Sequence, residues 1–255
     1  MAKHNKWSKI KRKKAVTDKR RGASWTKIIR AIMVASRESG PEPSSNVGLR
    51  FAMDEARYAN IPRDTVERAT KKGSGDLESA AYESMRYEGY APGGVAVIVE
   101  ALTDNRARTI ADVRLAFSDV EGNVGATGTV AYMFTQKGEI VLVGDNDKKP
   151  LNGDKLLEAA LDAGAEDVEE PDSEGEDWTV YTEPTQFEAV KKSLEQAGYV
   201  VREAKFVMIP ANRVEVRGEH AKAVVELVDA LEGLDDVQKV FTNADIPDDE
   251  MNKLA

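Results

Sequence analysis

The stretch Tyr87–Leu102, Y-E-G-Y-A-P-G-G-V-A-V-I-V-E-A-L, decides the fold class of this 255-residue chain. Residues 95–102 form an apolar run that is broken only by Glu100, which indicates a central strand. The residues at 82–90 alternate in polarity like a second strand, and the A-P-G-G sequence at 91–94 predicts a tight turn. We therefore expect a β-hairpin inside an antiparallel sheet.

The residues after this hairpin mix helix and strand signals. A helix is predicted over 106–120, and a glycine-rich loop follows at 122–128. Two more strands are expected at 129–134 and 139–143, joined by a Gln-Lys-Gly turn. Because helices and strands are interspersed, the pattern indicates an α+β protein.

Residues 139–206 have the element order β-α-β-β-α-β. After the strand at 139–143, the expected elements are a helix at 153–163, strands at 166–169 and 178–182, a helix at 185–197 and a strand at 199–208. This order is typical of the ferredoxin-like fold, in which two helices cover one face of an antiparallel sheet.

The C-terminal residues supply the second helix that the segment 77–134 lacks. That segment has only one helix, whereas 213–242 offers a short strand, a helix at 219–231 and a final strand. We therefore predict a discontinuous α+β domain, 77–134 plus 207–245, with a ferredoxin-like domain, 135–206, inserted into it. The residues from Asn243 to Ala255 are expected to fray, and 246–255 form a tail outside the domains.

The N-terminal part predicts a helical domain at 23–76 behind a basic arm at 1–22. Helices are expected at 24–39, with Ser24 as N-cap, at 43–59, and from Pro62 to Lys72. The predicted fold class is thus multidomain α+β, with a three-helix domain followed by two α+β domains.

Charge is distributed very unevenly along the chain. The first thirty residues hold twelve Lys and Arg residues and a single acid, Asp18, so they carry +11. The whole chain carries −9, which leaves −20 on residues 31–255. A cationic arm on an acidic body indicates that a short segment engages a polyanion while the body repels it.

Lysine and arginine neutralise phosphates, and Trp7 within this arm offers a stacking surface for an unpaired base. A solvated tail without a partner is the alternative for the arm. Arg106, Arg108 and Arg114 either extend the phosphate track or pair with nearby acids such as Asp104. The candidate nucleic-acid-binding residues are Lys3, His4, Lys6, Trp7, Lys9, Lys11, Arg12, Lys13, Lys14, Lys19, Arg20, Arg21, Lys27, Arg30, Arg106, Arg108 and Arg114.

Other classes of function find little support. The chain has no cysteine, which excludes disulfides, cysteine-ligated metals and thiol catalysis. The loop at 122–128 follows a helix and precedes a strand, the reverse of a nucleotide-binding loop. The acidic run at 167–177 does not have calcium-loop spacing, so it is either a solvated loop or a weak Mg²⁺ site. We expect no enzyme activity, cofactor, metal, small-molecule substrate or membrane span, and a cytoplasmic location.

Several long motifs resemble those of one family. They are H-N-K-W-S-K-I-K-R-K-K at 4–14, S-N-V-G-L-R at 45–50, A-N-I-P-R-D-T-V-E-R-A at 59–69, K-K-G-S-G at 71–75, Y-E-G-Y-A-P-G-G-V-A at 87–96, T-D-N-R-A-R-T at 103–109 and G-N-V-G-A-T-G-T-V-A-Y-M-F at 122–134. Together they resemble the YebC/PmpR family, the bacterial relatives of the mitochondrial translational activator of cytochrome oxidase subunit one. Lys3 stands where the family's opening motif has glycine, and the stretch at 22–27 also departs from the family pattern.

The resemblance implies a helical domain followed by two α+β domains, the third inserted into the second. It also implies a DNA-binding transcriptional regulator by the family's label. The alternative is a translation factor that binds ribosomal RNA and relieves stalling, for example at proline runs. A third hypothesis is a protein-binding scaffold that the arm only tethers. The sequence shows no dimerisation seam, so we expect a monomer.

Overall fold

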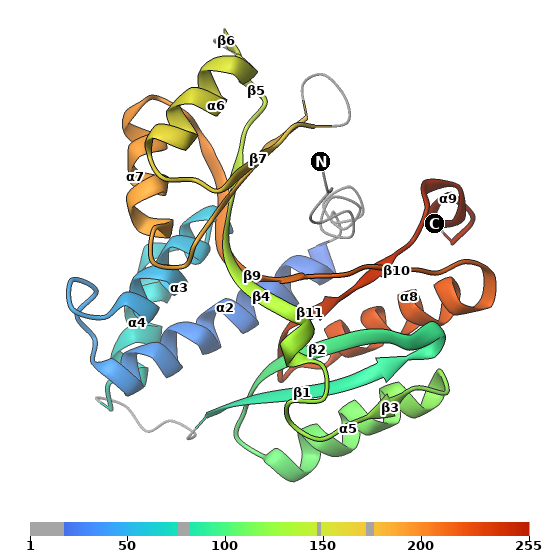
Figure 1. Cartoon of the computed structure of the whole chain (residues 1–255). Coiled ribbons are helices and arrows are strands. Elements are labelled where there is room, and N and C mark those ends of the chain that lie inside the picture. The colour runs from blue at the N-terminus through green and yellow to red at the C-terminus, as the bar shows by residue number, and fades with distance from the viewer. Residues whose placement is uncertain (1–17, 76–81, 147–148, 172–175, 255) are drawn as a thin grey trace. The chain divides into compact units, whose positions relative to one another are not determined.

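The computed structural model describes residues 18–75, 82–146, 149–171 and 176–254 (Figure 1). The side chains of 18–23 and 145–150, and those of 248 and 252, are not described. The described residues group into two compact units. The smaller unit includes Arg57–Asn60 and Gln136–Ile209, and the larger unit includes the described residues up to Ala56, Ile61–Thr135 and the residues from Pro210 onward. The domain boundaries drawn from the sequence stay a prediction.

Three helices open the larger unit. They are α2 (Asp18–Ser39), α3 (Val47–Tyr58) and α4 (Arg63–Gly73). Gly73 packs so closely on the backbone of Met33 that a Cβ atom at this position would clash with it. Asn46 joins two of the helices, because its Oδ1 accepts from the Leu49 N–H at 2.9 Å and its amide donates to the Ala35 carbonyl at 2.7 Å. The structure confirms an N-terminal helical part.

Two predicted helix starts were wrong. Helix α2 begins at Asp18 and passes through Gly22, where the sequence indicated a break. An interior glycine costs a helix only about 1 kcal/mol relative to alanine, so the flanking turns can continue through it. Helix α3 begins at Val47, later than predicted, because Asn46 and not a residue near 43 caps it.

The larger unit also contains a four-stranded sheet with the order β11-β2-β1-β3. The strands are β1 (Glu83–Ala91), β2 (Val95–Thr103), β3 (Asn123–Val124) and β11 (Val237–Thr242). The expected hairpin is present, with β1 antiparallel to β2 and the 3₁₀ turn η1 (Pro92–Gly94) between them. Gly93 there has a φ of 80°, which a residue with a side chain rarely adopts.

Two helices pack on this sheet, α5 (Arg106–Asp119) and α8 (Gly218–Gly233). Their apolar residues, such as Phe117 and Val224, form one buried core with the alternate residues Val97 and Val99 of β2. Strand β11 comes from the far end of the chain and pairs antiparallel with β2, so that Val240 lies opposite Val99. The core is therefore shared between segments that lie far apart in the sequence.

The last residues of the chain are more regular than we predicted. Strand β10 (Val214–Glu215) pairs in parallel with β12 (Ala244–Asp245), and α9 (Asp248–Leu254) follows. Met251 of α9 is only 5% exposed because it packs into the core beside α8. The expectation of a frayed tail was wrong because its apolar side chains Ile246 and Met251 are buried in the core and Leu254 packs against it.

The smaller unit has the predicted ferredoxin-like topology. Its sheet has the order β7-β8-β4-β9. The elements are β4 (Phe134–Leu142), β5 (Asp145–Asn146), β6 (Lys149–Pro150), α6 (Gly153–Asp162), β7 (Asp167–Glu169), β8 (Trp178–Thr182), α7 (Phe187–Gln196) and β9 (Val201–Pro210). The buried residues Leu156 of α6 and Leu194 of α7 lie on the apolar sides of these helices. The α+β fold class is confirmed.

One predicted hairpin in this region is absent from the structure. Residues 131–133 form the 3₁₀ turn η2 (Ala131–Met133), and β4 then runs unbroken through the predicted Gln-Lys-Gly turn. Gly138 is needed for close packing, since an added Cβ atom would clash with the Phe187 ring and lie 2.5 Å from the Thr182 Oγ1 atom. A glycine is therefore required at this position, but the reason is the close approach of a neighbouring side chain and not a turn.

Replacing Gly138 by alanine should consequently destabilise the protein by about 1–3 kcal/mol, the usual cost of overpacking a filled site. The measurement is the shift of the urea unfolding midpoint. Gly233→Ala is the matched control, because no atom lies within 4 Å of the Cβ position there and the residue belongs to a helix. Equal effects of the two substitutions would contradict the packing role of Gly138.

Candidate nucleic-acid interface

The structure covers only part of the predicted site. Of the candidates, Lys3, His4, Lys6, Trp7, Lys9, Lys11, Arg12, Lys13 and Lys14 lie outside the described residues. Lys19, Arg20 and Arg21 lie in the first turns of α2, where only the backbone is described. Lys27 and Arg30 follow on α2, and Arg106, Arg108 and Arg114 lie on α5.

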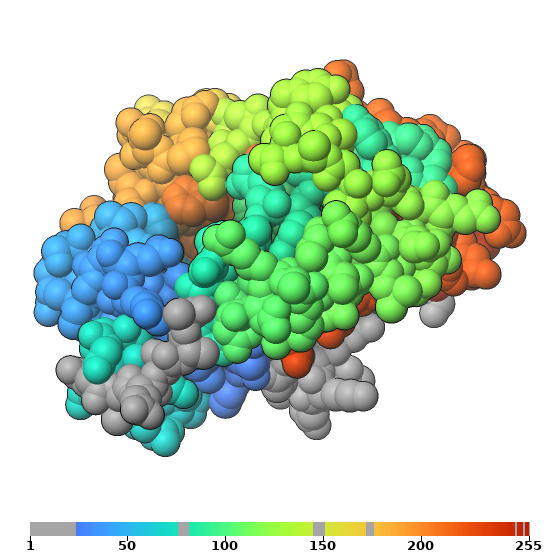
Figure 2. Space-filling view, turned by 90° about the horizontal axis from the view of Figure 1, so that it is seen from below, coloured from blue at the N-terminus to red at the C-terminus, as the bar shows by residue number. Residues whose placement is uncertain are grey.

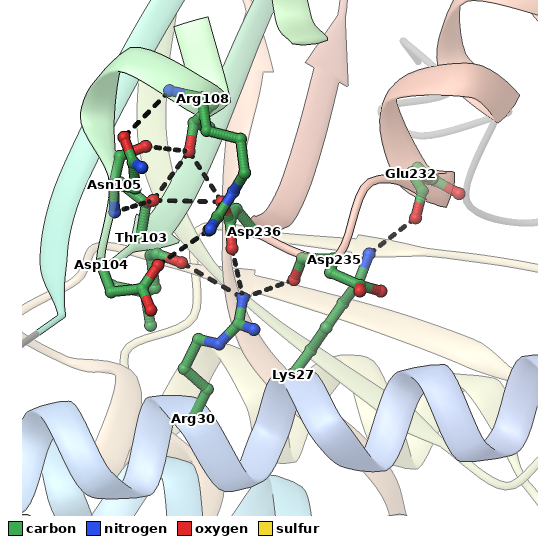
Figure 3. A network of polar contacts seen from close by, with 11 residues as sticks. Lys27, Arg30, Thr103, Asp104, Asn105, Arg108, Glu232, Asp235 and Asp236 are labelled. Carbon is green, nitrogen blue, oxygen red and sulfur yellow. Dashed lines mark hydrogen bonds and ion pairs between the residues drawn. The ribbon is translucent and has the colours of Figure 1, made fainter. Parts of the chain in front are cut away.

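Arg30 points into the protein. Its Nη1 atom donates to the Leu102 carbonyl at 3.2 Å, to the Asp235 carbonyl at 2.5 Å and to Asp236 Oδ1 at 3.1 Å (Figure 3). The guanidinium carbon also lies 4.9 Å from the ring centroid of Tyr82, within cation–π range. With only 11% of its side chain exposed, Arg30 holds helix α2 on the sheet.

Asp236 collects donors from several elements. Its Oδ2 atom accepts from Thr103 Oγ1 at 3.0 Å, from Thr109 Oγ1 at 2.7 Å and from Arg108 Nη2 at 2.7 Å. Arg108 in turn donates to Asp104 Oδ1 at 2.8 Å. The side chain of Asp236 is 8% exposed, so this carboxylate is buried but well partnered (Figure 3). We call Arg30, Thr103, Arg108, Thr109 and Asp236 the Asp236 cluster.

The cluster is charged at neutral pH. Burial alone would raise the pKa of the Asp236 carboxyl. Hydrogen bonds from Arg108, Thr109 and Thr103, together with the positive charge of Arg108, outweigh burial and leave that pKa below its ordinary value. Hydrogen bonds to Asp236 and Asp104 raise the pKa of Arg108. Both partners therefore keep their charges over the physiological range.

The motif T-D-N-R-A-R-T at 103–109 explains how the donors from Thr103, Arg108 and Thr109 come together. Asn105 caps α5, because its Oδ1 accepts from the Arg108 N–H at 3.1 Å, and the Asn105 N–H donates to Thr103 Oγ1 at 2.8 Å. One turn of helix then brings Arg108 and Thr109 next to Thr103. Sequence reasoning missed Asp236, the acceptor that these donors share. No local pattern distinguishes this residue from the other acids.

The remaining candidates divide between bonded and open positions. Lys27 Nζ donates to the Glu232 carbonyl at 2.7 Å, in the same segment as Asp236. Arg106 pairs with Glu83 yet keeps 66% of its side chain exposed. Arg114 lies exposed on α5, whose outer side (green) is open in the view of Figure 2. Pairing with acids, the alternative for these arginines, thus holds for Arg106 and Arg108.

The glycine-rich loop is organised around a buried acid. Glu88 of β1 is 2% exposed, and its carboxylate accepts from the N–H groups of Gly128 at 2.9 Å, Val130 at 2.8 Å and Ala131 at 2.8 Å. Burial raises the pKa of Glu88, but these three backbone donors and the charge of Arg86 lower it below its ordinary value. The loop is therefore clamped to the sheet by an ionised carboxylate.

Two kinds of site are absent from the described residues. Among them, no group of three or more histidine, cysteine, aspartate or glutamate side chains is placed to hold a metal ion. Residues 172–175 of the acidic run are not among the described residues. No described helix is both long enough and apolar enough to cross a membrane.

Comparison with known proteins gives a consistent result. The model of the TACO1/YebC protein N-terminal domain matches residues 5–76, and that of the TACO1/YebC second and third domain matches 82–244. A relative from Acidithiobacillus ferrooxidans is 50% identical and covers all of this chain and 98% of its own length. Another from Trichlorobacter lovleyi is 48% identical, with both chains covered completely. Both are named "Probable transcriptional regulatory protein".

A solved structure agrees with the fold. The crystal structure of a conserved hypothetical protein from Aquifex aeolicus is 43% identical to this chain, with a TM-score of 0.82. The match covers 92% of this chain and 94% of that one. Because the two domain models together span most of its length and its relatives are regulatory proteins by name, the protein belongs to the YebC/PmpR family, the TACO1/YebC proteins.

Proposed function

We propose that the protein is a nucleic-acid-binding regulator of gene expression whose basic N-terminal residues make the main contact with phosphates. The observation that carries this proposal is the charge of +11 on the first thirty residues against −20 on the rest of the chain. The regulatory names of its relatives support it. It acts as a cytoplasmic monomer without catalysis or a cofactor.

The candidates on the described helices divide into two roles in this proposal. Arg114 and the exposed side of Arg106 extend the phosphate track along α5. Arg30 donates to Asp236 and to a nearby carbonyl, and Arg108 donates to Asp236, so these two arginines hold the track in place. The binding energy then comes chiefly from the residues before α2, through neutralised phosphates and released counterions.

The target is DNA by the label of the family, with ribosomal RNA as the second candidate. One set of contacts favours RNA. A helix that reads the major groove presents unpaired Arg, Asn or Gln side chains to base edges. Here Arg50 of α3 donates to the Pro43 carbonyl at 3.0 Å. On α4, Arg63 and Arg68 pair with Glu67 and Asp64, at 2.9 and 3.4 Å.

The proposal is tested by the salt dependence of binding. The full chain and a variant lacking residues 1–17 are titrated with single-stranded RNA and with duplex DNA between about 50 and 200 mM salt. We expect the deletion to weaken binding by at least about tenfold and to flatten the salt slope, because seven cationic side chains are lost. Unchanged affinity and slope would favour the scaffold hypothesis, and an unchanged unfolding midpoint shows that the variant is folded.

The two targets are separated by sedimentation of a cell lysate on a sucrose gradient, with and without RNase. Comigration with ribosomal subunits that requires residues 1–17 would establish the RNA target. Sedimentation as free protein, unaffected by RNase, together with tighter binding to duplex DNA, would establish the DNA target.

A further inference from the structure

We propose that the ring of Tyr132 stacks on an unpaired base of the bound nucleic acid, a contact that the candidate residues do not include. This inference rests on the proposed function and adds a contact with bases to the contacts with phosphates. Tyr132 lies in the 3₁₀ turn η2, directly after the glycine-rich loop. The residues that support the inference all belong to the described part of the larger unit.

Tyr132 is the most exposed aromatic residue in the described part of the chain. It is 77% exposed, whereas every other aromatic residue whose burial is described is buried or partly buried. A single exposed apolar side chain is ordinary on a protein surface. An open aromatic ring nevertheless has the surface that stacking on a base requires, because every base has a π-face. What the ring binds therefore depends on how it is held and on the charge around it.

The backbone on both sides of Tyr132 is fixed by hydrogen bonds. The N–H groups of Val130 and Ala131 each donate to Glu88 Oε2 at 2.8 Å. The Met133 N–H donates to the Val130 carbonyl at 2.9 Å, and Val130 is fully buried. The turn is therefore formed before any ligand arrives, so that little conformational entropy is lost when a base contacts the ring.

The hydroxyl end of the ring also has a neighbour. Burial raises the pKa of Tyr90 above its ordinary value, and the charge of Tyr132 and a hydrogen bond to Tyr132 raise it further. The Tyr90 hydroxyl donates to the Thr129 carbonyl at 3.4 Å, so this pair is connected to the loop. A tyrosine has only two side-chain torsions, and this contact restrains them while the ring stays open to solvent.

The charge around the turn suits a polyanion. Residues 122–138 contain no aspartate or glutamate, and after residue 38 no other stretch of this length lacks an acid. Glu88, the acid that the turn contacts, is only 2% exposed and accepts from three backbone N–H groups. Phosphates beside Tyr132 therefore meet no exposed acid of the same segment. An apolar protein surface would gain nothing from the missing acids, so we assign the ring to a base.

The test measures the affinity of the full chain for two strands of about 15 nucleotides, an oligodeoxyadenylate and the same sugar-phosphate backbone without bases. Tyr132→Leu keeps apolar volume but removes the π-face. We expect it to weaken binding of the oligodeoxyadenylate about tenfold and to change binding of the abasic strand by less than about twofold. The slope of affinity against salt concentration should stay the same, because no charge is lost.

Two further variants serve as controls. Tyr132→Phe keeps the ring and should bind both strands within about twofold of the wild type. Leu161→Ala removes an exposed apolar side chain, 52% exposed, from α6 of the smaller unit, and should leave both affinities unchanged. The urea midpoint of each variant shows whether it is folded.

Photocrosslinking of the wild-type chain supplies a measurement that needs no variant. The strand carries 5-iodouracil in place of one base, and the crosslinked peptide is identified by mass spectrometry. We expect a crosslink in the peptide that contains Tyr132. Should Tyr132→Leu fail to fold, this measurement decides the outcome.

Four results would overturn the inference. They are equal effects of Tyr132→Leu and Leu161→Ala, equal losses on the two strands, a loss in Tyr132→Phe as large as in Tyr132→Leu, and crosslinks confined to other peptides. In each of these cases, binding of the strands by the wild type would leave the proposed function intact. If the wild-type chain binds neither strand nor duplex DNA, the proposed function fails as well, which distinguishes that failure from the others.

Discussion

Replacing Asp236 by alanine is expected to lower the free energy of unfolding by about 3–5 kcal/mol, the range for removing one partner of a buried ion pair. The cost arises because Arg30, with 11% of its side chain exposed, would stay buried without its counter-charge, and because the hydroxyl of Thr103 would lose its acceptor. Urea denaturation followed by circular dichroism measures it.

Asp235→Ala is the matched control for this substitution. It removes a carboxylate from the adjacent, exposed residue. It should change the free energy of unfolding by less than about 0.5 kcal/mol, as usual for exposed sites. A loss below about 1 kcal/mol for Asp236→Ala would contradict the idea that the carboxylate is a buried hub of the fold.

The effect should also depend on pH in a defined direction. The pKa of Asp236 is lower in the folded protein than the unfolded value of about 3.9. The stabilisation is therefore fully present above the unfolded pKa and is lost as the pH falls through the folded pKa. The difference in stability between wild type and Asp236→Ala should be constant near neutral pH and should shrink in acid. A difference that grew in acid would contradict the direction of the shift.

Replacing Glu88 by alanine is expected to have the second large effect, a loss of about 3 kcal/mol or more. The carboxylate serves the buried N–H group of Val130 and the partly buried N–H groups of Gly128 and Ala131, and a buried N–H group that loses its acceptor costs about 1–3 kcal/mol. Amide hydrogen exchange at these three residues is the direct measurement, because opening of the loop should accelerate it there first.

Glu88→Gln is a milder substitution at the same position. Glutamine keeps one oxygen for Val130 and Ala131 but turns an NH₂ group towards the Gly128 N–H. We expect an intermediate loss of stability with fast exchange concentrated at Gly128. Because the pKa of Glu88 is lowered by folding, the difference between wild type and Glu88→Gln should also shrink as the pH falls below the unfolded pKa. Unchanged exchange in both variants would contradict the clamp.

Local patterns explain why much of the fold was predictable. The hairpin of β1 and β2 is encoded within the 87–102 stretch, since an apolar run, a Pro-Gly-Gly turn and an alternating strand are adjacent in sequence. The ferredoxin-like order could be derived in the same way, because each element has its own periodicity. Two of the errors occurred at a glycine that was interpreted as a break or a turn. Gly22 lies inside a helix, and Gly138 makes room for Phe187 instead of forming a turn.

The candidate site was less predictable, because its decisive contacts are not local. The sequence identified Arg30 and Arg108 by charge, and both belong to one cluster in the structure. It could not indicate that their shared acceptor is Asp236, which is 206 positions from Arg30 and is one of 45 acidic residues. Side-chain charge alone therefore does not distinguish an arginine that meets a phosphate from one that organises the fold.

The position of β11 has a consequence for the protein while it is being synthesised. Strand β2 is buried on its free edge only when β11, which begins at Val237, pairs with it. During synthesis at ~5–20 residues per second, β2 leaves the ribosome several seconds before its partner exists. Throughout that interval an apolar strand edge is open to other chains. A message truncated anywhere before β11 should thus yield a product that cellular proteases remove, so that incomplete copies of this regulator do not accumulate.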